Sequence, residues 1–335
     1  MTELDLARAQ MAMLFAFHIL FAVAGMGMPV LMVIAERAHL RTGHPVYAEL
    51  ARRWAKGTSI LFAVGAVSGT VLSFELGLLW PRFMAFAGGV IGLPFALEGF
   101  AFFTEAIFLG IYLYGWDRVS PRLHLASGVL VALGGIFSGI FVVTANAWMN
   151  SPAGFTLVGG RPVDVSPLAA MLNPASATET IHMVLAAFVA SGFAVAGIHA
   201  FLLLKDRENL FHRKALEIAL AVGGAAAVLQ PISGDMNARF VARNQPVKLA
   251  ALEGQFETER GAPLRIGGIP DVASRTTRYA IEIPKGLSLL AFHDPEDPEP
   301  GTNEDDRGCY ADELLPGGHG APHNASPGKP TTHSS

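Results

Sequence analysis

Six long apolar segments constrain the fold of this chain more than any other feature of its sequence. A helix needs about 20 predominantly apolar residues to cross the hydrocarbon core of a bilayer. Segments of about that length occupy, approximately, residues 10–34, 57–80, 93–115, 124–148, 178–204 and 215–232. Only 16% of the residues are charged, against about 25% in soluble domains. The sequence therefore predicts an all-α integral membrane protein, built on a bundle of about six transmembrane helices.

The remaining composition narrows the class of protein further. A net charge of −4 over 335 residues favours no nucleic-acid partner. Cys309 is the only cysteine, so the sequence holds neither a disulfide framework nor the Cys-X-X-Cys-His motif that attaches c-type haem. The first apolar segment is too long and too weakly basic at its start for a cleaved signal peptide, and we expect it to remain as a membrane helix.

Basic residues predict the orientation of the bundle. The loops after the first, third and fifth segments contain eleven Lys and Arg residues, whereas those after the second and fourth contain only Arg82 and Arg161. Because cytoplasmic loops carry an excess of Lys and Arg, this distribution places the N-terminus outside.

The chain changes character after Ile232, which divides it into three regions. Residues 1–232 form the transmembrane region. Residues 233–292 are polar and are expected to form an external hydrophilic loop, because even the apolar stretch at its end, from Gly286 to Phe292, is too short to cross a bilayer. Residues 293–335 are rich in Asp, Glu, Pro, Gly and His, a composition that predicts a disordered tail.

Two acidic residues lie inside the third apolar segment. Glu98 and Glu105 are seven residues apart, so a helix places them on one face, about 10 Å apart along its axis. An acid within the membrane is costly and is usually retained for a partner, a cavity or a cofactor. The pair indicates a proton path or a cofactor environment. The structural alternative is a neutral acid that hydrogen-bonds to a neighbouring helix.

Two histidines also lie in apolar segments. His18 is in the first segment, and His182 is near the start of the fifth. A neutral imidazole in such a setting is a usual axial ligand of haem iron, although a histidine can also simply bond a neighbouring carbonyl. No apolar segment pairs histidines at the short spacing of a non-haem metal site, which favours isolated axial ligands. With the N-terminus outside, His18, His182, Glu98 and Asn146 fall in the outer half of the bundle, and Glu105 lies deeper than Glu98.

Short stretches along the chain carry a specific resemblance. In the apolar segments they are Phe17-His18-Ile19-Leu20-Phe21, Ser73-Phe74-Glu75-Leu76-Gly77-Leu78-Leu79-Trp80, Leu97-Glu98-Gly99, Phe103-Thr104-Glu105, Ala145-Asn146-Ala147-Trp148-Met149 and Ile181-His182. In the polar loop they are Val247-Lys248-Leu249-Ala250-Ala251-Leu252-Glu253, Gly268-Ile269-Pro270-Asp271 and Glu282-Ile283-Pro284-Lys285-Gly286-Leu287. With these motifs in this order, the chain resembles subunit I of cytochrome bd quinol oxidase over about residues 1–292. The stretch from Ser73 to Trp80 and the compact polar loop resemble the cyanide-insensitive branch of that family.

The resemblance implies three haems and a path for protons. His182 would be an axial ligand of the low-spin haem b, and His18 an axial ligand of one of the two high-spin haems, a haem b and a haem d. Glu98 would lie beside the high-spin haems as a ligand or proton donor. Glu105 and Asn146 would continue the proton route that oxygen reduction requires.

In the loop, the resemblance implies that Lys248 and Glu253 bind or deprotonate quinol, a role in which a carboxylate acts as base and a lysine polarises the oxygen. Without the family, these two residues would be interpreted as a solvated surface pair. The resemblance further implies a bacterial inner (cytoplasmic) membrane, lipid contacts, quinol and O₂ as reactants and subunit II as partner, and it allows a small accessory membrane subunit.

The chain departs from the family after Phe292. The family continues with helices that carry a methionine ligand, a glutamate ligand and a Gly-Arg-Gln-Pro-Trp motif, none of which follows here. We therefore expect a truncation or frameshift near His293, and lost or strongly impaired oxidase activity. Two alternatives stay open. One is a haem-free proton-coupled transporter or channel with Glu98, Glu105 and His182 as its relay, and the other is a non-functional remnant that binds at most one haem.

Overall fold

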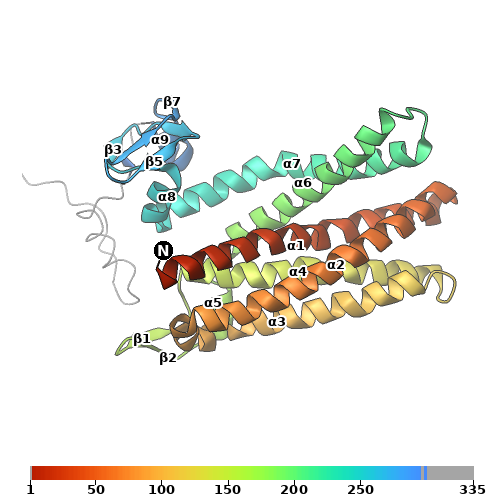
Figure 1. Cartoon of the computed structure of the whole chain (residues 1–335), viewed down its shortest axis with the longest axis horizontal. Helices are drawn as coiled ribbons and strands as arrows, with labels where there is room; N and C mark the ends of the chain where they lie inside the picture. The colour runs from red at the N-terminus through yellow and green to blue at the C-terminus, as the bar shows by residue number, and fades with distance from the viewer. Residues whose placement is uncertain (1, 296–297, 300–335) are drawn as a thin grey trace, which may run out of the picture. The chain divides into compact units, whose positions relative to one another are not determined.

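Two compact units make up the structure. The computed structural model of the chain describes residues 2–295 and 298–299. The first unit ends at Gln245 and is a bundle of long helices, whereas the second begins at Pro246 and combines short strands with two short helices (Figure 1).

Six long helices confirm the predicted transmembrane architecture, since each is long and apolar enough to cross a membrane. They are α1 (Glu3–Thr42), α2 (Pro45–Leu79), α3 (Pro81–Tyr114), α4 (Pro121–Asn150), α6 (Ser176–Leu203) and α7 (Leu210–Asn244). Prolines at the first position of α2, α3 and α4 suit a helix start, where the missing N–H would be unpaired anyway. Ser120 and Asn209 cap α4 and α7 by accepting a hydrogen bond from a backbone N–H of the first turn.

The predicted end of the sixth segment at residue 232 is too early. Helix α7 passes through Pro231 and continues to Asn244. Its last turns are polar, and an ion pair of 2.6 Å between Asp235 and Arg239 joins successive turns of the helix. Hydropathy alone could not detect this extension. The first unit therefore ends at Gln245 rather than at 232.

Helix α1 has the central position in the first unit, because it contacts α2, α4, α6 and α7. Consecutive helices form antiparallel pairs, α1 with α2, α3 with α4 and α6 with α7 (Figure 1). Small residues allow the closest approaches. At the α6–α7 crossing, a Cβ atom on Gly192 would lie only 2.6 Å from the Cα atom of Gly223. These packed helices hold the polar side chains of the candidate site between them.

The connection between α4 and α6 contains local structure that the sequence did not predict. Strands β1 (Thr156–Val158) and β2 (Arg161–Val163) form an antiparallel hairpin, and the short helix α5 (Pro167–Met171) follows. Asn173 anchors this connection, because its side-chain amide donates to the carbonyl oxygens of Thr144 and Ala170.

The second unit is more ordered than the polar loop that we expected. Its elements are α8 (Pro246–Glu253), β3 (Glu259–Arg260), β4 (Leu264–Ile266), β5 (Ile269–Asp271), β6 (Thr276–Arg278), β7 (Ile281–Ile283), α9 (Gly286–Phe292) and β8 (Pro298–Glu299). The strands pair antiparallel as β3 with β8, β4 with β7 and β5 with β6. The apolar stretch at 286–292 is helix α9, whose Leu287 and Ala291 are buried. The predicted disorder of 293–335 falls mostly on residues outside those that the structure describes.

Candidate functional site

His18 lies on α1 against a Ser–Gly pair of α2. Its Nδ1 atom is 2.9 Å from the Oγ atom of Ser68. The Ser68 hydroxyl already donates to the carbonyls of Val64 and Gly65, at 3.0 and 3.1 Å. It therefore accepts from His18, so Nδ1 carries the ring proton and Nε2 keeps its lone pair. The next residue, Gly69, makes room for the ring, since a Cβ atom there would lie 2.9 Å from His18 Cε1.

His182 has a similar Ser–Gly neighbourhood on a different pair of helices. Its Nδ1 atom on α6 is 3.1 Å from the Oγ atom of Ser233 on α7. The Ser233 hydroxyl donates to the Gln230 carbonyl at 2.9 Å, so it too accepts from the histidine. Gly234 follows the serine, and a Cβ atom there would contact His182 Cε1 at 3.5 Å.

Both histidines therefore fit the role of haem ligands. An iron-binding histidine normally donates its other ring N–H to a hydrogen-bond acceptor, which fixes the tautomer and orients the ring. Among the residues that the structure describes, no group of three or more His, Cys, Asp or Glu side chains could hold a metal ion. The two sites differ at Gln230, whose amide nitrogen lies 3.1 Å from Nε2 and 3.2 Å from Nδ1 of His182 and donates to the His182 carbonyl at 3.3 Å. A ligand at Nε2 therefore requires this amide to turn away.

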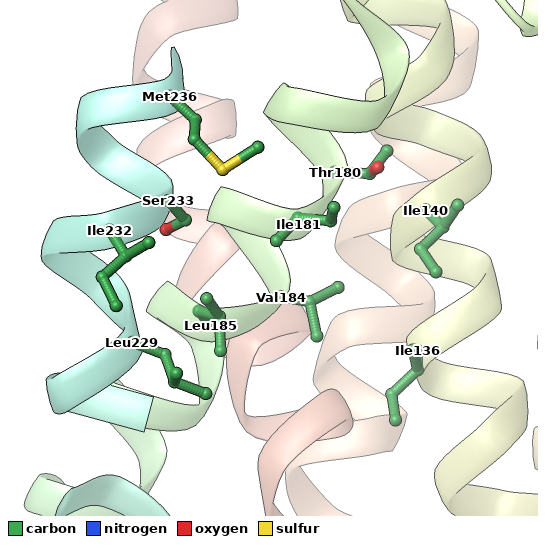
Figure 2. A pocket seen from close by; sticks show the side chains of 10 residues that line it. All are labelled: Ile136, Ile140, Thr180, Ile181, Val184, Leu185, Leu229, Ile232, Ser233 and Met236. Atoms are coloured by element: carbon green, nitrogen blue, oxygen red, sulfur yellow. The ribbon is translucent and has the colours of Figure 1, made fainter. Parts of the chain in front are cut away.

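A groove adjoins the His182 site. It has a volume of about 440 Å³ and an almost entirely apolar lining. Its walls come from α4, α6 and α7, as Figure 2 shows, through Ile136, Ile140, Thr180, Ile181, Val184, Leu185, Leu229, Ile232, Ser233 and Met236. Ser233 therefore both lines the groove and accepts from His182.

Glu105 is buried, with 5% of its surface exposed, where α1, α3 and α4 meet. Its Oε1 atom has no hydrogen-bond partner among the described residues. A Cβ atom on Gly25 or Gly135 would lie 3.7 or 3.4 Å from this oxygen, so the carboxyl occupies space that these glycines leave open. An unpartnered acid in such a place is suited to carry a proton, because nothing else satisfies it.

The other predicted membrane residues are less enclosed. Glu98 is half-buried on α3, with its carboxyl beside the Ser138 hydroxyl of α4. Asn146 is exposed near the end of α4. It lies 11 residues from Gly135, or about 16 Å along the helix. The first unit thus brings Glu105 between three helices and leaves Asn146 apart from it.

A buried pair that the sequence did not suggest lies towards the end of the bundle at which α1 and α3 finish. Nδ1 of His124 is 2.7 Å from Oε1 of Glu36, and each side chain is only 2% exposed. Nε2 of His124 donates to the Tyr112 carbonyl at 2.9 Å. The pair joins α1, α3 and α4. Its two members are 88 residues apart in the chain, so no spacing pattern could have indicated it.

In the second unit, Lys248 and Glu253 both lie on α8 and are half-buried. A spacing of five residues points them about 140° apart around a helix, so they do not share a face. Burial raises the pKa of the Glu253 carboxyl, and the nearby positive charge of Arg265 partly offsets this rise. This raised pKa makes Glu253 a better proton acceptor near neutral pH than an exposed glutamate.

The chain as a whole is similar to known proteins. The family profile "Cytochrome bd terminal oxidase subunit I" matches residues 6–328, and so extends past residue 292, where we expected the resemblance to end. The putative cytochrome bd menaquinol oxidase subunit I of Bacillus subtilis (strain 168) is 40% identical over 295 residues, 87% of this chain and 67% of that protein. Cytochrome bd-II ubiquinol oxidase subunit 1 of Escherichia coli (strain K12) is 33% identical over 302 residues, 89% of this chain and 59% of that protein.

A solved structure is similar as well. The bd oxidase from Geobacillus thermodenitrificans matches with a TM-score of 0.84 and 41% identity, over 90% of this chain and 70% of that one. The chain therefore spans about three fifths to two thirds of the length of the two curated relatives.

Proposed function

Because the chain belongs to the cytochrome bd terminal oxidase subunit I family, we propose that it is the quinol-oxidising subunit I of a bd-type terminal oxidase. In this role it passes electrons from quinol through haems to O₂ in an aerobic respiratory chain. The observation that supports the proposal is the pair of membrane histidines, each with Nδ1 beside a serine hydroxyl of a neighbouring helix and each next to a glycine. Nε2 of His182 becomes available to a ligand once the Gln230 amide turns away. A haem-free transporter offers no reason for two such sites.

The histidines would hold two of the haems. His182 is the proposed axial ligand of a low-spin haem b, and His18 of a high-spin haem, either haem b or haem d. Bound haem supplies one-electron transfer and the place where O₂ is reduced. The serines keep the Nδ1 proton on each ring, which raises the basicity of Nε2 and fixes the ring plane.

The acids would handle protons. Oxygen reduction consumes protons inside the membrane, so it needs groups that can hold and release them there. Glu105 lies unpartnered between three helices. Glu98 lies about two turns earlier on the same helix, with its carboxyl beside the Ser138 hydroxyl. These two acids are the proposed proton carriers. Asn146 is the proposed outer member of the route, at the exposed end of α4.

Quinol oxidation would involve the second unit. Removing two electrons from a quinol releases two protons, so a base close to the hydroxyl assists the reaction. Glu253, with its pKa raised by burial, is the proposed base, and Lys248 on the same helix is the proposed partner of the quinol oxygen.

The proposed setting is a bacterial inner (cytoplasmic) membrane, with the N-terminus outside and subunit II as partner. Eleven basic residues in alternate loops support this orientation. A small accessory membrane subunit is compatible with the lipid-facing surface, where large apolar side chains such as Phe100 are 72% exposed.

The test is a reduced-minus-oxidised optical spectrum of membranes that contain this chain together with subunit II. We expect b-type and d-type haem signals. His182→Ala should remove the low-spin b signal and His18→Ala one high-spin signal, whereas His39→Ala, on the same helix as His18, should retain all of them. A chain shown to be inserted but without haem above the host background would contradict the proposal. A proton-flux assay on Glu98→Gln and Glu105→Gln would then separate a transporter from a remnant.

The serines provide a second test that does not depend on turnover. Ser68→Ala and Ser233→Ala each remove the acceptor of one histidine N–H. Changes of this kind typically cost about 10–100-fold in metal affinity, so we expect partial haem loss confined to the corresponding site. Ser73→Ala, on α2, is the control, because Ser73 bonds only a backbone carbonyl of its own helix. Equal haem content in all three variants would show that the serines do not support the ligands.

A further inference from the structure

Arg265 holds three segments of the second unit together. It lies on β4 with only 14% of its side chain exposed. Its guanidinium hydrogen-bonds to the Oε1 atom of Gln255, contacts Oε1 of Glu282 on β7 at 3.0 Å and lies 3.6 Å from Oε1 of Glu259 on β3. A planar guanidinium with several donors suits such a multiple contact, which lysine cannot reproduce.

Through Gln255, this arginine reaches the end of helix α8. Gln255 is 2% exposed. Its backbone N–H donates to the Ala250 carbonyl at 2.8 Å, and its side-chain amide donates to the Glu257 carbonyl at 2.7 Å. Gly254, at a φ of 60°, makes the left-handed turn that ends the helix. The Arg265–Gln255 contact therefore fixes the turn that directly follows Glu253.

Glu253 is the last residue of α8, which is an unfavourable place for a carboxylate. The C-terminal end of a helix carries a partial negative charge, and the side chain is half-buried. Burial raises its pKa, and the positive charge of Arg265 lowers it again in part. The arginine thus acts on this carboxyl in two ways, by position and by charge.

We propose that Arg265 is a positioning residue for quinol oxidation, because it holds the end of α8, and with it Glu253, through Gln255. The inference rests on the proposed role of Glu253 as base. It adds a residue outside the Lys248–Glu253 helix to the quinol-side machinery.

The neighbouring charges determine the sign of the expected effect. Glu259 on β3 and Glu282 on β7 face Arg265, and Lys248 shares α8 with Glu253. Without the arginine, Glu253 loses a favourable positive charge, and the two other carboxylates lose their counter-ion. Both changes disfavour the ionised form of Glu253. The acidic limb of a reaction that needs Glu253 ionised therefore moves to higher pH when Arg265 is neutralised.

The experiment compares Arg265→Gln, Arg265→Lys and Gln255→Ala with the parent chain in membranes that contain subunit II, with ubiquinol-1 as substrate. Arg265→Gln should move the acidic limb of kcat/KM upward by about one pH unit. Arg265→Lys keeps the charge and should shift it by less than half as much. Gln255→Ala keeps the arginine and should lower kcat with little shift. Arg278→Gln, an exposed arginine paired with Asp271 at 2.5 Å, is the matched control and should leave the profile unchanged.

A second readout is independent of turnover. The Glu253 carboxyl is titrated by infrared difference spectroscopy, and its band is identified by subtracting the spectrum of Glu253→Gln. We expect Arg265→Gln to raise its midpoint and Arg278→Gln to leave it in place. An unchanged midpoint in Arg265→Gln, or an equal shift in both variants, would overturn the inference. A raised midpoint without any quinol oxidation would support the link between Arg265 and Glu253 and refute the proposed function of the chain.

Discussion

Glu36 and Glu105 are both buried where α1, α3 and α4 meet, and each has one carboxyl oxygen without a hydrogen-bond partner among the described residues, but Glu36 also pairs with a histidine. Glu36 is 2% exposed and contacts His124 at 2.7 Å, whereas Oε1 of Glu105, at 5% exposure, contacts no hydrogen-bond donor among the described residues. Because Nε2 of His124 must donate to the Tyr112 carbonyl, the Glu36 pair is either imidazolium with carboxylate or neutral imidazole with a carboxylic acid. Either form holds the same number of protons.

The difference separates an acid that pairs with a side chain of another helix from the acid that we propose as a proton carrier. Nδ1 of His124 contacts Oε1 of Glu36 and its Nε2 donates to the Tyr112 carbonyl, so the pair joins α1, α3 and α4. Oε1 of Glu105 has no hydrogen-bond partner among the described residues. This oxygen occupies the space that Gly25 and Gly135 leave open because they have no side chain. Burial alone therefore does not distinguish these two acids, whereas their hydrogen-bond partners do.

The largest expected effect follows from breaking the structural pair. His124→Leu leaves Glu36 buried without its partner, and the loss of one member of a buried pair typically costs about 3–5 kcal/mol of stability. Unfolding of the detergent-solubilised protein should show this loss. The double variant Glu36→Leu/His124→Leu removes both charges and should recover most of it. A single variant as stable as the parent would mean that the pair does not hold the helices.

An intermediate effect is expected at the glycine beside Glu105. A Cβ atom on Gly135 would lie 2.9 Å from the carbonyl oxygen of Gly25, a backbone atom that cannot turn away. Gly135→Ala should therefore force α1 and α4 apart and cost about 1–3 kcal/mol. Gly110→Ala on α3 is the control, since a Cβ atom there meets nothing within 4 Å. Gly110→Ala should raise the free energy of unfolding by about 0.5–1 kcal/mol, because alanine loses less conformational freedom in a helix than glycine does. Equal stability of the two variants would contradict the close approach.

The smallest change in stability is expected for Glu105 itself. Glu105→Gln removes no hydrogen bond at Oε1, so the free energy of unfolding should change by less than about 1 kcal/mol. If Glu105 carries protons, quinol-dependent oxygen uptake of the complex with subunit II should nevertheless fall by about tenfold or more. Oxygen electrode and unfolding measurements on one preparation test both parts. A large loss of stability with unchanged turnover would reverse the comparison and make Glu105 the structural acid.

Part of the site was predictable because its residues are unusual in their local sequence. His18, His182, Glu98 and Glu105 are polar groups in apolar segments, and such groups are rare in membrane helices. Ser68 and Ser233 carry no such signal, because serine is common in these helices and bonds its own backbone. Each meets its histidine only across 50 or 51 residues of chain. The same holds for Arg265, whose partners lie on three separate segments.

Hydropathy misjudged one boundary and missed the strands of the second unit, each for a physical reason. The last turns of α7 are polar, and their ion pair supports a helix that the hydropathy pattern ends at residue 232. The short strands of the second unit contain only two or three residues each, so no alternation could develop. Their order comes from cross-strand pairing such as β4 with β7.

The sequence by itself determined the six membrane helices, because crossing a bilayer depends on the length and apolar content of each segment alone. It also determined which polar groups those helices carry into the membrane. Tertiary structure alone decided their roles, because a role depends on which atom lies opposite. His124 lies opposite Glu36, glycines lie opposite Glu105, and serines lie opposite the two histidines. These contacts join residues far apart in the chain, so only the packing of the helices could select them.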